Sequence, residues 1–165
     1  MSAPFAELEA LYRDVDARHA AHSCPASTEC CRFGVTGREP YVTSVELAYL
    51  TRAIARRGGR TPPPPPPLVR SGLPMLRDER VCPLLDPSGK CSAYDARPLG
   101  CRSFYCDRAS WDARVTQREI GAWVRRVKEI ALAHEPRGDE GRPLTNALPA
   151  ARGAATKRRA RPRGP

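Results

Sequence analysis

The sequence predicts a small, irregular and mainly α-helical domain of about three helices joined by cysteine-bearing loops. Apolar residues recur at helical spacing in three separate segments of the 165-residue chain. All seven cysteines lie outside those segments, near Pro, Gly or Arg. Aromatic residues make up only 6% of the chain. Because such a light core rarely stabilises a small domain alone, we expect the loops to be held together by a staple.

The first helix is expected over residues 3–21. Four apolar residues in this range are spaced by three or four positions, namely Phe5, Leu8, Tyr12 and Val15. This spacing places them on one face, which predicts a stripe buried against the rest of the domain.

The second helix is expected after a short extended piece at Tyr41 and Val42. Thr43 and Glu46 have the spacing of a capping box, which marks a helix start. Gly58 and Gly59 supply the stop signal. The predicted buried stripe of this helix consists of Leu47, Leu50 and Ile54.

The third helix is expected from Thr116 to His134, and Pro136 ends it. Its predicted apolar face consists of Ile120, Trp123, Val124, Val127, Ile130 and Ala131. Upstream, the turn-forming run from Asp86 to Gly89 predicts one short hairpin between residues 81–85 and 90–94.

We expect one domain over residues 1–135, followed by a basic disordered tail over 136–165. A proline-rich loop at 58–80, which contains the run Pro62–Pro67, is predicted to be an insertion within that domain. A longer loop adds little closure entropy, so such an insertion is tolerable. The prolines favour a polyproline II conformation, and their role stays open.

The net charge of +10 is unevenly distributed. Residues 151–165 hold six Lys or Arg and no acid, whereas residues 1–150 hold 22 basic and 18 acidic side chains. Such a tail can bind nucleic acid or an anionic partner through counterion release. We favour a solvated tail, because no aromatic residues are interleaved there to stack on bases.

We expect a cytoplasmic protein that does not enter a membrane. No apolar run approaches the ~20 residues that span a bilayer. The first 16 residues carry four acids, whereas a secretion signal starts with basic residues. In the cytoplasm thiols stay reduced, and an odd number of cysteines also argues against a disulfide framework.

The cysteines therefore indicate a metal-stapled domain. Thiolates are soft ligands that suit zinc or an iron–sulfur cluster. We favour the cluster, because seven sulfurs exceed the four that one tetrahedral zinc takes. The candidate metal ligands are Cys24, Cys30, Cys31, Cys82, Cys91, Cys101 and Cys106.

These residues resemble the YkgJ-type cysteine-cluster family, which is described as a zinc- or iron-chelating domain. The resemblance covers about residues 20–110 and three blocks. The first block, CxxCxxCC in the family, is matched by Cys24, Cys30 and Cys31. The second, a CP-apolar-L element, is matched by Cys82, Pro83 and Leu85. The third and most specific block is matched by Cys91, Tyr94, Arg97, Pro98, Cys101 and Arg102, with Cys106 as a further cysteine. Metal chelation is what the resemblance implies.

The sequence departs from the family pattern at Ser27, where the second cysteine of the first block is expected. The site then lacks one sulfur, and His22 or water is a candidate substitute, although His22 is more simply an exposed histidine at a helix end. Arg32, Arg97, Arg102 and Arg108 each lie within six residues of a cysteine. They either offset the thiolate charge or form surface salt bridges, for instance between Arg97 and Asp95.

Three classes of function follow from these residues. The first is a metal-binding protein without a known process. The second is a metal-dependent redox or transfer enzyme with an open coordination position near Ser27, although no catalytic motif is present. The third is a nucleic-acid or partner-binding module that uses residues 151–165.

Overall fold

The computed structural model of the chain describes residues 2–20, 28–59, 80–103 and 115–148. It is mainly helical, as predicted, with one two-stranded antiparallel sheet. The helices are α1 (Ala3–Arg18), α2 (Phe33–Thr36), α3 (Ser44–Arg56), α4 (Leu99–Arg102) and α5 (Gln117–His134). The described residues also form two 3-10 turns, η1 (Glu29–Cys31) and η2 (Tyr94–Ala96), and the strands β1 (Tyr41–Val42) and β2 (Arg142–Pro143).

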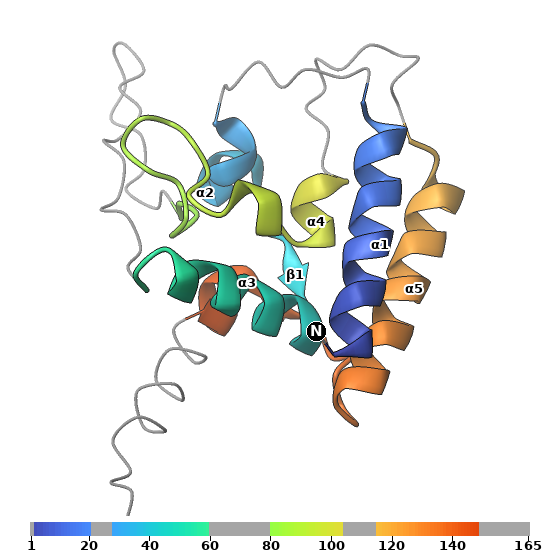
Figure 1. The fold of residues 1–165 in the computed structure, drawn as a ribbon. Coiled ribbons are helices and arrows are strands. Elements are labelled where there is room, and N and C mark those ends of the chain that lie inside the picture. Colours follow the sequence, from blue (N-terminus) through green and yellow to red (C-terminus); the bar gives the residue numbers. More distant parts are fainter. Residues whose placement is uncertain (1, 21–27, 60–79, 104–114, 149–165) are drawn as a thin grey trace, which may run out of the picture.

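Helices α1 and α5 lie side by side and antiparallel (Figure 1). Two ion pairs confirm the direction, since Arg18 meets Glu119 at one end and Glu7 meets Arg126 towards the other. The predicted stripe of α1 is buried, and the helix ends at Arg18, three residues before the predicted end. Within the described part of the chain, no helix combines the length and apolar character that crossing a bilayer requires.

Helix α3 separates two hydrophobic clusters. Its capping box and its glycine stop are as predicted, with Thr43 as N-cap and positive φ angles at Gly58 and Gly59. Val45 packs with the apolar faces of α1 and α5, which form the helical cluster. Leu50 and Ile54 pack on the other side with residues from the cysteine-bearing segments, which form the loop cluster.

The apolar face of α5 is buried only in its second half. Val127, Ile130 and Ala131 are buried, as predicted. Ile120 and Trp123 are half-buried, and Val124 is 40% exposed. In the first half of the predicted stripe, Ile120 and Val124 line a pocket, whereas Trp123 packs against the helical cluster.

The prediction of a disordered tail from residue 136 was wrong at its start. Strand β2 pairs with β1, with Tyr41 opposite Pro143 and Val42 opposite Arg142. Residues 144–148 are helical and add three buried side chains to the loop cluster, namely Leu144, Ala147 and Leu148. The composition of the segment concealed this packing, because only a few apolar residues carry it.

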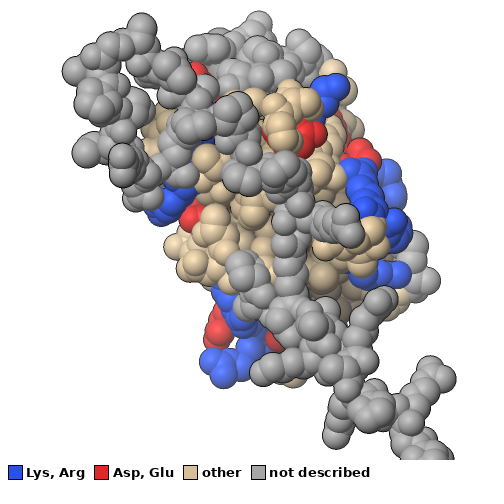
Figure 2. All heavy atoms as spheres, turned by 90° about the vertical axis from the view of Figure 1, so that its left-hand side faces the viewer, with Lys and Arg blue, Asp and Glu red and all other residues tan. Residues whose placement is uncertain are grey.

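The predicted hairpin around Asp86–Gly89 forms as a tight turn with a single antiparallel bridge between Leu85 and Cys91. The main-chain N–H of Asp86 donates to the carbonyl of Lys90 at 2.9 Å, and Gly89 has a φ of 80°. The loop that contains this turn lies on the left of Figure 1. Figure 2 looks onto that side, where the part not covered in grey is largely uncharged, with Lys and Arg towards its margins.

Several predictions fall on residues outside the described ranges. These are the Pro62–Pro67 run, the basic segment 151–165, and the positions Cys24, Cys106, His22, Ser27 and Arg108.

Candidate functional site

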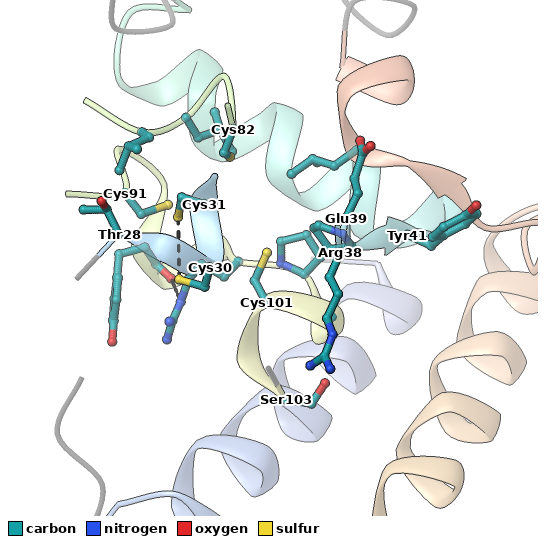
Figure 3. Close-up of a pocket in the computed structure, with 18 of the residues that line it drawn as sticks. Thr28, Cys30, Cys31, Arg38, Glu39, Tyr41, Cys82, Cys91, Cys101 and Ser103 are labelled. Atoms are coloured by element: carbon teal, nitrogen blue, oxygen red, sulfur yellow. Dashed lines mark hydrogen bonds between the residues drawn. The ribbon is translucent and has the colours of Figure 1, made fainter. Parts of the chain in front are cut away.

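Five of the seven predicted ligands lie in the described residues, and all five line one pocket of about 720 Å³ (Figure 3). They are Cys30, Cys31, Cys82, Cys91 and Cys101, and each is a free thiol. They come from two separated stretches of the sequence, residues 30–31 and residues 82–101. Among the described residues, the tertiary structure therefore brings cysteines from each of the three sequence blocks to one place.

Cys30 and Cys31 lie in the 3-10 turn η1. The turn starts after Thr28, whose φ of 61° is unusual for a residue with a side chain, and the N–H of Cys31 donates to the carbonyl of Thr28 at 2.9 Å. The two sulfur atoms are 3.9 Å apart. The tight turn thus holds two adjacent thiols close to each other at the pocket.

Cys82 and Cys91 are placed by main-chain contacts. The N–H of Cys82 donates to the carbonyl of Cys31 at 2.7 Å, next to an antiparallel bridge between Arg32 and Val81. Cys91 follows the Asp86–Gly89 turn and pairs with Leu85. Because hydrogen bonds of the backbone join these segments, the cysteines of the first two blocks keep a defined spacing.

Cys101 lies in α4, which begins directly after Pro98. The N–H of Leu99 at the start of this helix donates to Oε1 of Glu46 at 2.7 Å. Gly100 lies against Pro40, where a Cβ atom would come within 2.9 Å of the proline Cβ. These two contacts hold the short helix, and with it Cys101, against the start of α3.

Glu46 contacts the helix that carries Cys101, and the sequence predicted only part of this role. The residue is buried, with 2% of its surface exposed. Besides Leu99, it accepts hydrogen bonds from the N–H and hydroxyl of Thr43 at 2.9 and 2.8 Å and from the hydroxyl of Tyr12 at 3.2 Å. The capping-box spacing predicted the contact with Thr43. No local signal predicts the contacts with Tyr12 and Leu99, which are distant in sequence.

Cys30, Cys31, Cys91 and Cys101 hold their protons more strongly than ordinary cysteines. Burial raises the pKa of Cys91, and burial together with the nearby Cys31 and Cys91 sulfurs raises the pKa of Cys101. A hydrogen bond with Cys31, followed by burial, raises the pKa of Cys30. The hydrogen bond with Cys30 lowers the pKa of Cys31, but a hydrogen bond with Cys82 and burial outweigh it and raise this pKa to about 12. A metal that binds these sulfurs has to displace protons.

The arginines near the cysteines take different roles. Arg97 lines the pocket, and its charge lowers the pKa of Cys30, Cys91 and Cys101, although the opposing effects prevail. Its guanidinium lies 3.6 Å from the centre of the Tyr94 ring. Asp95 pairs with Arg57 at 3.3 Å. Among the arginines that sequence reasoning singled out, Arg97 is thus a cation that acts on the pocket sulfurs.

Arg102 has a structural role. It is 6% exposed, lies 4.1 Å from the centre of the Tyr12 ring, and forms an ion pair with Asp16 of α1. Its Nε donates to the carbonyl of Arg97 at 2.8 Å. Arg102 therefore ties the segment that carries Cys101 to α1.

The donor set fits a thiophilic metal in its chemistry, since five sulfurs face a common space. As placed, no three Cys, His, Asp or Glu side chains of the described ranges form a group that could hold one metal ion. Loading one ion on the described thiols alone would therefore need movements of their side chains as well as the loss of protons.

The pocket also has an apolar wall, meaning here the apolar part of its lining, which was not predicted as part of the site. It includes Ile120 and Val124 of α5 and Leu144 after β2. The signal that points to this wall is the length of the apolar stripe on α5, which continues beyond the part that packs against α1.

No protein-family model, curated protein or solved structure matches this chain.

Proposed function

We propose that this chain is a cytoplasmic metal-binding protein that holds an iron–sulfur cluster or zinc through cysteine thiolates. The observation that carries the proposal is the convergence of Cys30, Cys31, Cys82, Cys91 and Cys101 on one pocket. Buried thiols without a ligand or disulfide partner usually pack singly in a core. Five that share one pocket favour a common ligand instead.

The chemistry of sulfur limits the choice of metal. Thiolates select zinc, iron–sulfur clusters and monovalent copper over hard ions such as magnesium. Seven cysteines in the chain exceed the four of a single zinc site, which favours the cluster. The resemblance to the YkgJ-type family, which rests on three blocks of residues, supports metal chelation and leaves the metal open.

The test is metal and sulfide analysis after anaerobic purification of the full-length chain. A brown protein with iron and acid-labile sulfide supports the cluster, and a colourless protein with stoichiometric zinc supports zinc. We expect Cys31→Ser and Cys101→Ser each to lower the bound metal per chain. Ser103→Ala is the matched control, because Ser103 lines the same pocket without a thiol. Wild-type metal content in both cysteine variants would contradict the proposal.

A metal-dependent enzyme is the second candidate function. The observation that favours it is the volume of the pocket, about 720 Å³, which leaves room for a small molecule beside a metal centre. Retention of one particular metabolite during purification, lost in Cys101→Ser but kept in Ser103→Ala, would support this candidate.

A further inference from the structure

The Cys30–Cys31 pair places two thiols within reach of one bridging atom. The residues are adjacent, and their sulfur atoms lie 3.9 Å apart at the edge of the pocket (Figure 3). A disulfide requires a separation of about 2.05 Å, so the pair would have to close over a short and stiff peptide unit to form one. When one atom bonds to both sulfurs, the two sulfurs have to move towards each other much less than in a disulfide.

The Cys30–Cys31 pair is more accessible to a ligand than a cysteine packed in a core, and it has free space beside it. Cys30 is exposed and Cys31 is half-buried. The lining of the same pocket includes the apolar side chains of Ile120, Val124 and Leu144. A bridging atom bound to the pair can therefore carry an apolar organic group into this space.

We propose that Cys30 and Cys31 together capture trivalent arsenic that carries one apolar organic substituent. Trivalent arsenic is a soft acceptor that matches soft sulfur donors. This inference goes beyond the proposed metal centre. It involves two of the same residues, but it does not depend on a bound metal.

The reaction balances without an added oxidant or reductant. An organic arsenic(III) oxide reacts with two thiols, two As–S bonds form, and two S–H bonds break. The oxygen of the oxide leaves as water together with both thiol protons. Arsenic stays trivalent, and the overall reaction releases no proton to the solvent because both thiol protons leave in the water.

Two bonds from one pair make the capture far stronger than one bond from a single thiol. Once the first sulfur is attached, the second reaction is intramolecular, and its effective concentration is high because the sulfur already lies nearby. Removing either thiol should therefore lower the apparent affinity by roughly 100-fold, the lower end of the gain that linkage provides.

Phenylarsine oxide is the probe, added to the metal-free full-length chain that has been reduced with a phosphine. Intact-mass measurement should show one phenylarsine per chain with loss of water. The adduct should survive excess glutathione, a monothiol, and should be removed by dimercaptopropanol, a dithiol.

The variants separate the pair from the other pocket thiols. We expect Cys30→Ser to lose the glutathione-resistant adduct and Cys91→Ser, which lines the same pocket, to keep it. Cys30 is the exposed member, so its substitution should leave the circular dichroism spectrum and the unfolding midpoint unchanged even if Cys31→Ser does not fold.

Wild-type affinity in Cys30→Ser would overturn the inference, and so would equal losses in Cys30→Ser and Cys91→Ser. The metal content of the same variants is measured separately. Absence of arsenic capture in a chain that still loads iron or zinc overturns this inference alone and leaves the proposed metal function standing.

Discussion

Glu46 shows what a single buried residue contributes to this fold. Its carboxylate connects α1, α3 and α4 through Tyr12, Thr43 and Leu99. A buried carboxylate is costly unless its oxygens are fully hydrogen-bonded, and here four donors meet them. The same contacts fix the start of the helix that carries Cys101, so Glu46 links the helical part of the molecule to the pocket.

We predict that Glu46→Gln lowers the free energy of unfolding by about 1–3 kcal/mol. The amide replaces one acceptor oxygen with an N–H₂ group, which then faces donors and leaves buried groups unpaired. Denaturant unfolding measures the loss. Tyr12→Phe is the control, since it removes one of the four donors and should cost only about 1 kcal/mol. A Glu46→Gln protein as stable as the wild type would show that the carboxylate is not needed as an acceptor.

At the scale of the elements, the junction of α1 and α5 depends on Glu119. Its carboxylate accepts a hydrogen bond from Arg18 at 2.8 Å and completes the capping box with Thr116. The hydrogen bond with Arg18, followed by those with Thr116, lowers the pKa of Glu119 from its ordinary value of 4.5 to about 2.

We predict that this contact weakens in acid over a defined window. Because the pKa of Glu119 is lower in the folded chain than in the unfolded chain, its stabilisation is fully present above 4.5 and is lost as the pH falls towards about 2. Unfolding midpoints of wild type and Glu119→Gln, measured across this window, should therefore converge at the acid end. A difference that stays constant with pH would contradict the prediction.

Another element-scale constraint lies where the chain leaves α5. The N–H of Ser44 donates to the carbonyl of Gly138 at 3.1 Å, which joins this segment to the start of α3. A Cβ atom at Gly138 would collide with the backbone carbonyl of Ala131 and with the hydroxyl of Ser44. Only a glycine lets the chain turn this closely over both helices.

We predict that Gly138→Ala destabilises the protein by about 1–3 kcal/mol, because a backbone atom has to move. Gly121→Ala is the matched control within α5. Its nearest contact would be the flexible end of Arg125 at 3.5 Å, and alanine favours the helix by up to ~1 kcal/mol. Thermal unfolding should shift down for the first variant and up for the second. Equal shifts would mean that the close contact at Gly138 is relieved without cost.

At the scale of the whole molecule, the core consists of the helical cluster and the loop cluster, with α3 between them. The loop cluster combines segments from distant parts of the chain, including Phe33, Leu84 and Leu144. Residues after α5 are thus part of the folded body rather than an appendage.

We predict that Leu144→Ala lowers the free energy of unfolding by about 2–5 kcal/mol, because it leaves a cavity at a fully buried position. Leu132→Ala on α5 is the control, since this leucine is 49% exposed and the change should stay within about 0.5 kcal/mol. Denaturant unfolding of both variants measures the difference. Equal small effects would place residues 144–148 outside the cooperative core.

Metal removal should affect the two clusters differently. If the proposed centre is present, a chelator with reductant should expose the loop cluster, which contains Cys82 and contacts Cys31 and Cys91. The helical cluster contains no cysteine and should persist. We therefore predict new proteolytic cleavage near residues 80–103 with most of the helical circular dichroism retained. A cleavage pattern that is unchanged after verified metal loss would show that metal does not staple the loops.

The sequence by itself determined the elements whose signals are local. Apolar spacing and capping residues predicted α1, α3 and α5, and turn residues predicted the Asp86–Gly89 turn. These signals act between residues at most a few positions apart, so the sequence carries them directly. The cysteines were identified as a candidate ligand set for the same reason, because their chemistry belongs to the residue type.

The tertiary structure decided which distant segments meet. The pairing of β1 with β2, the burial of Leu144 and the contact of Glu46 with Leu99 join positions far apart in the chain. Short strands and single buried leucines have no periodic pattern to reveal them, and their partners depend on how all segments pack together. The pocket arises in the same way, because its sulfurs and its apolar lining come from separate elements that only the packing of the whole chain brings together.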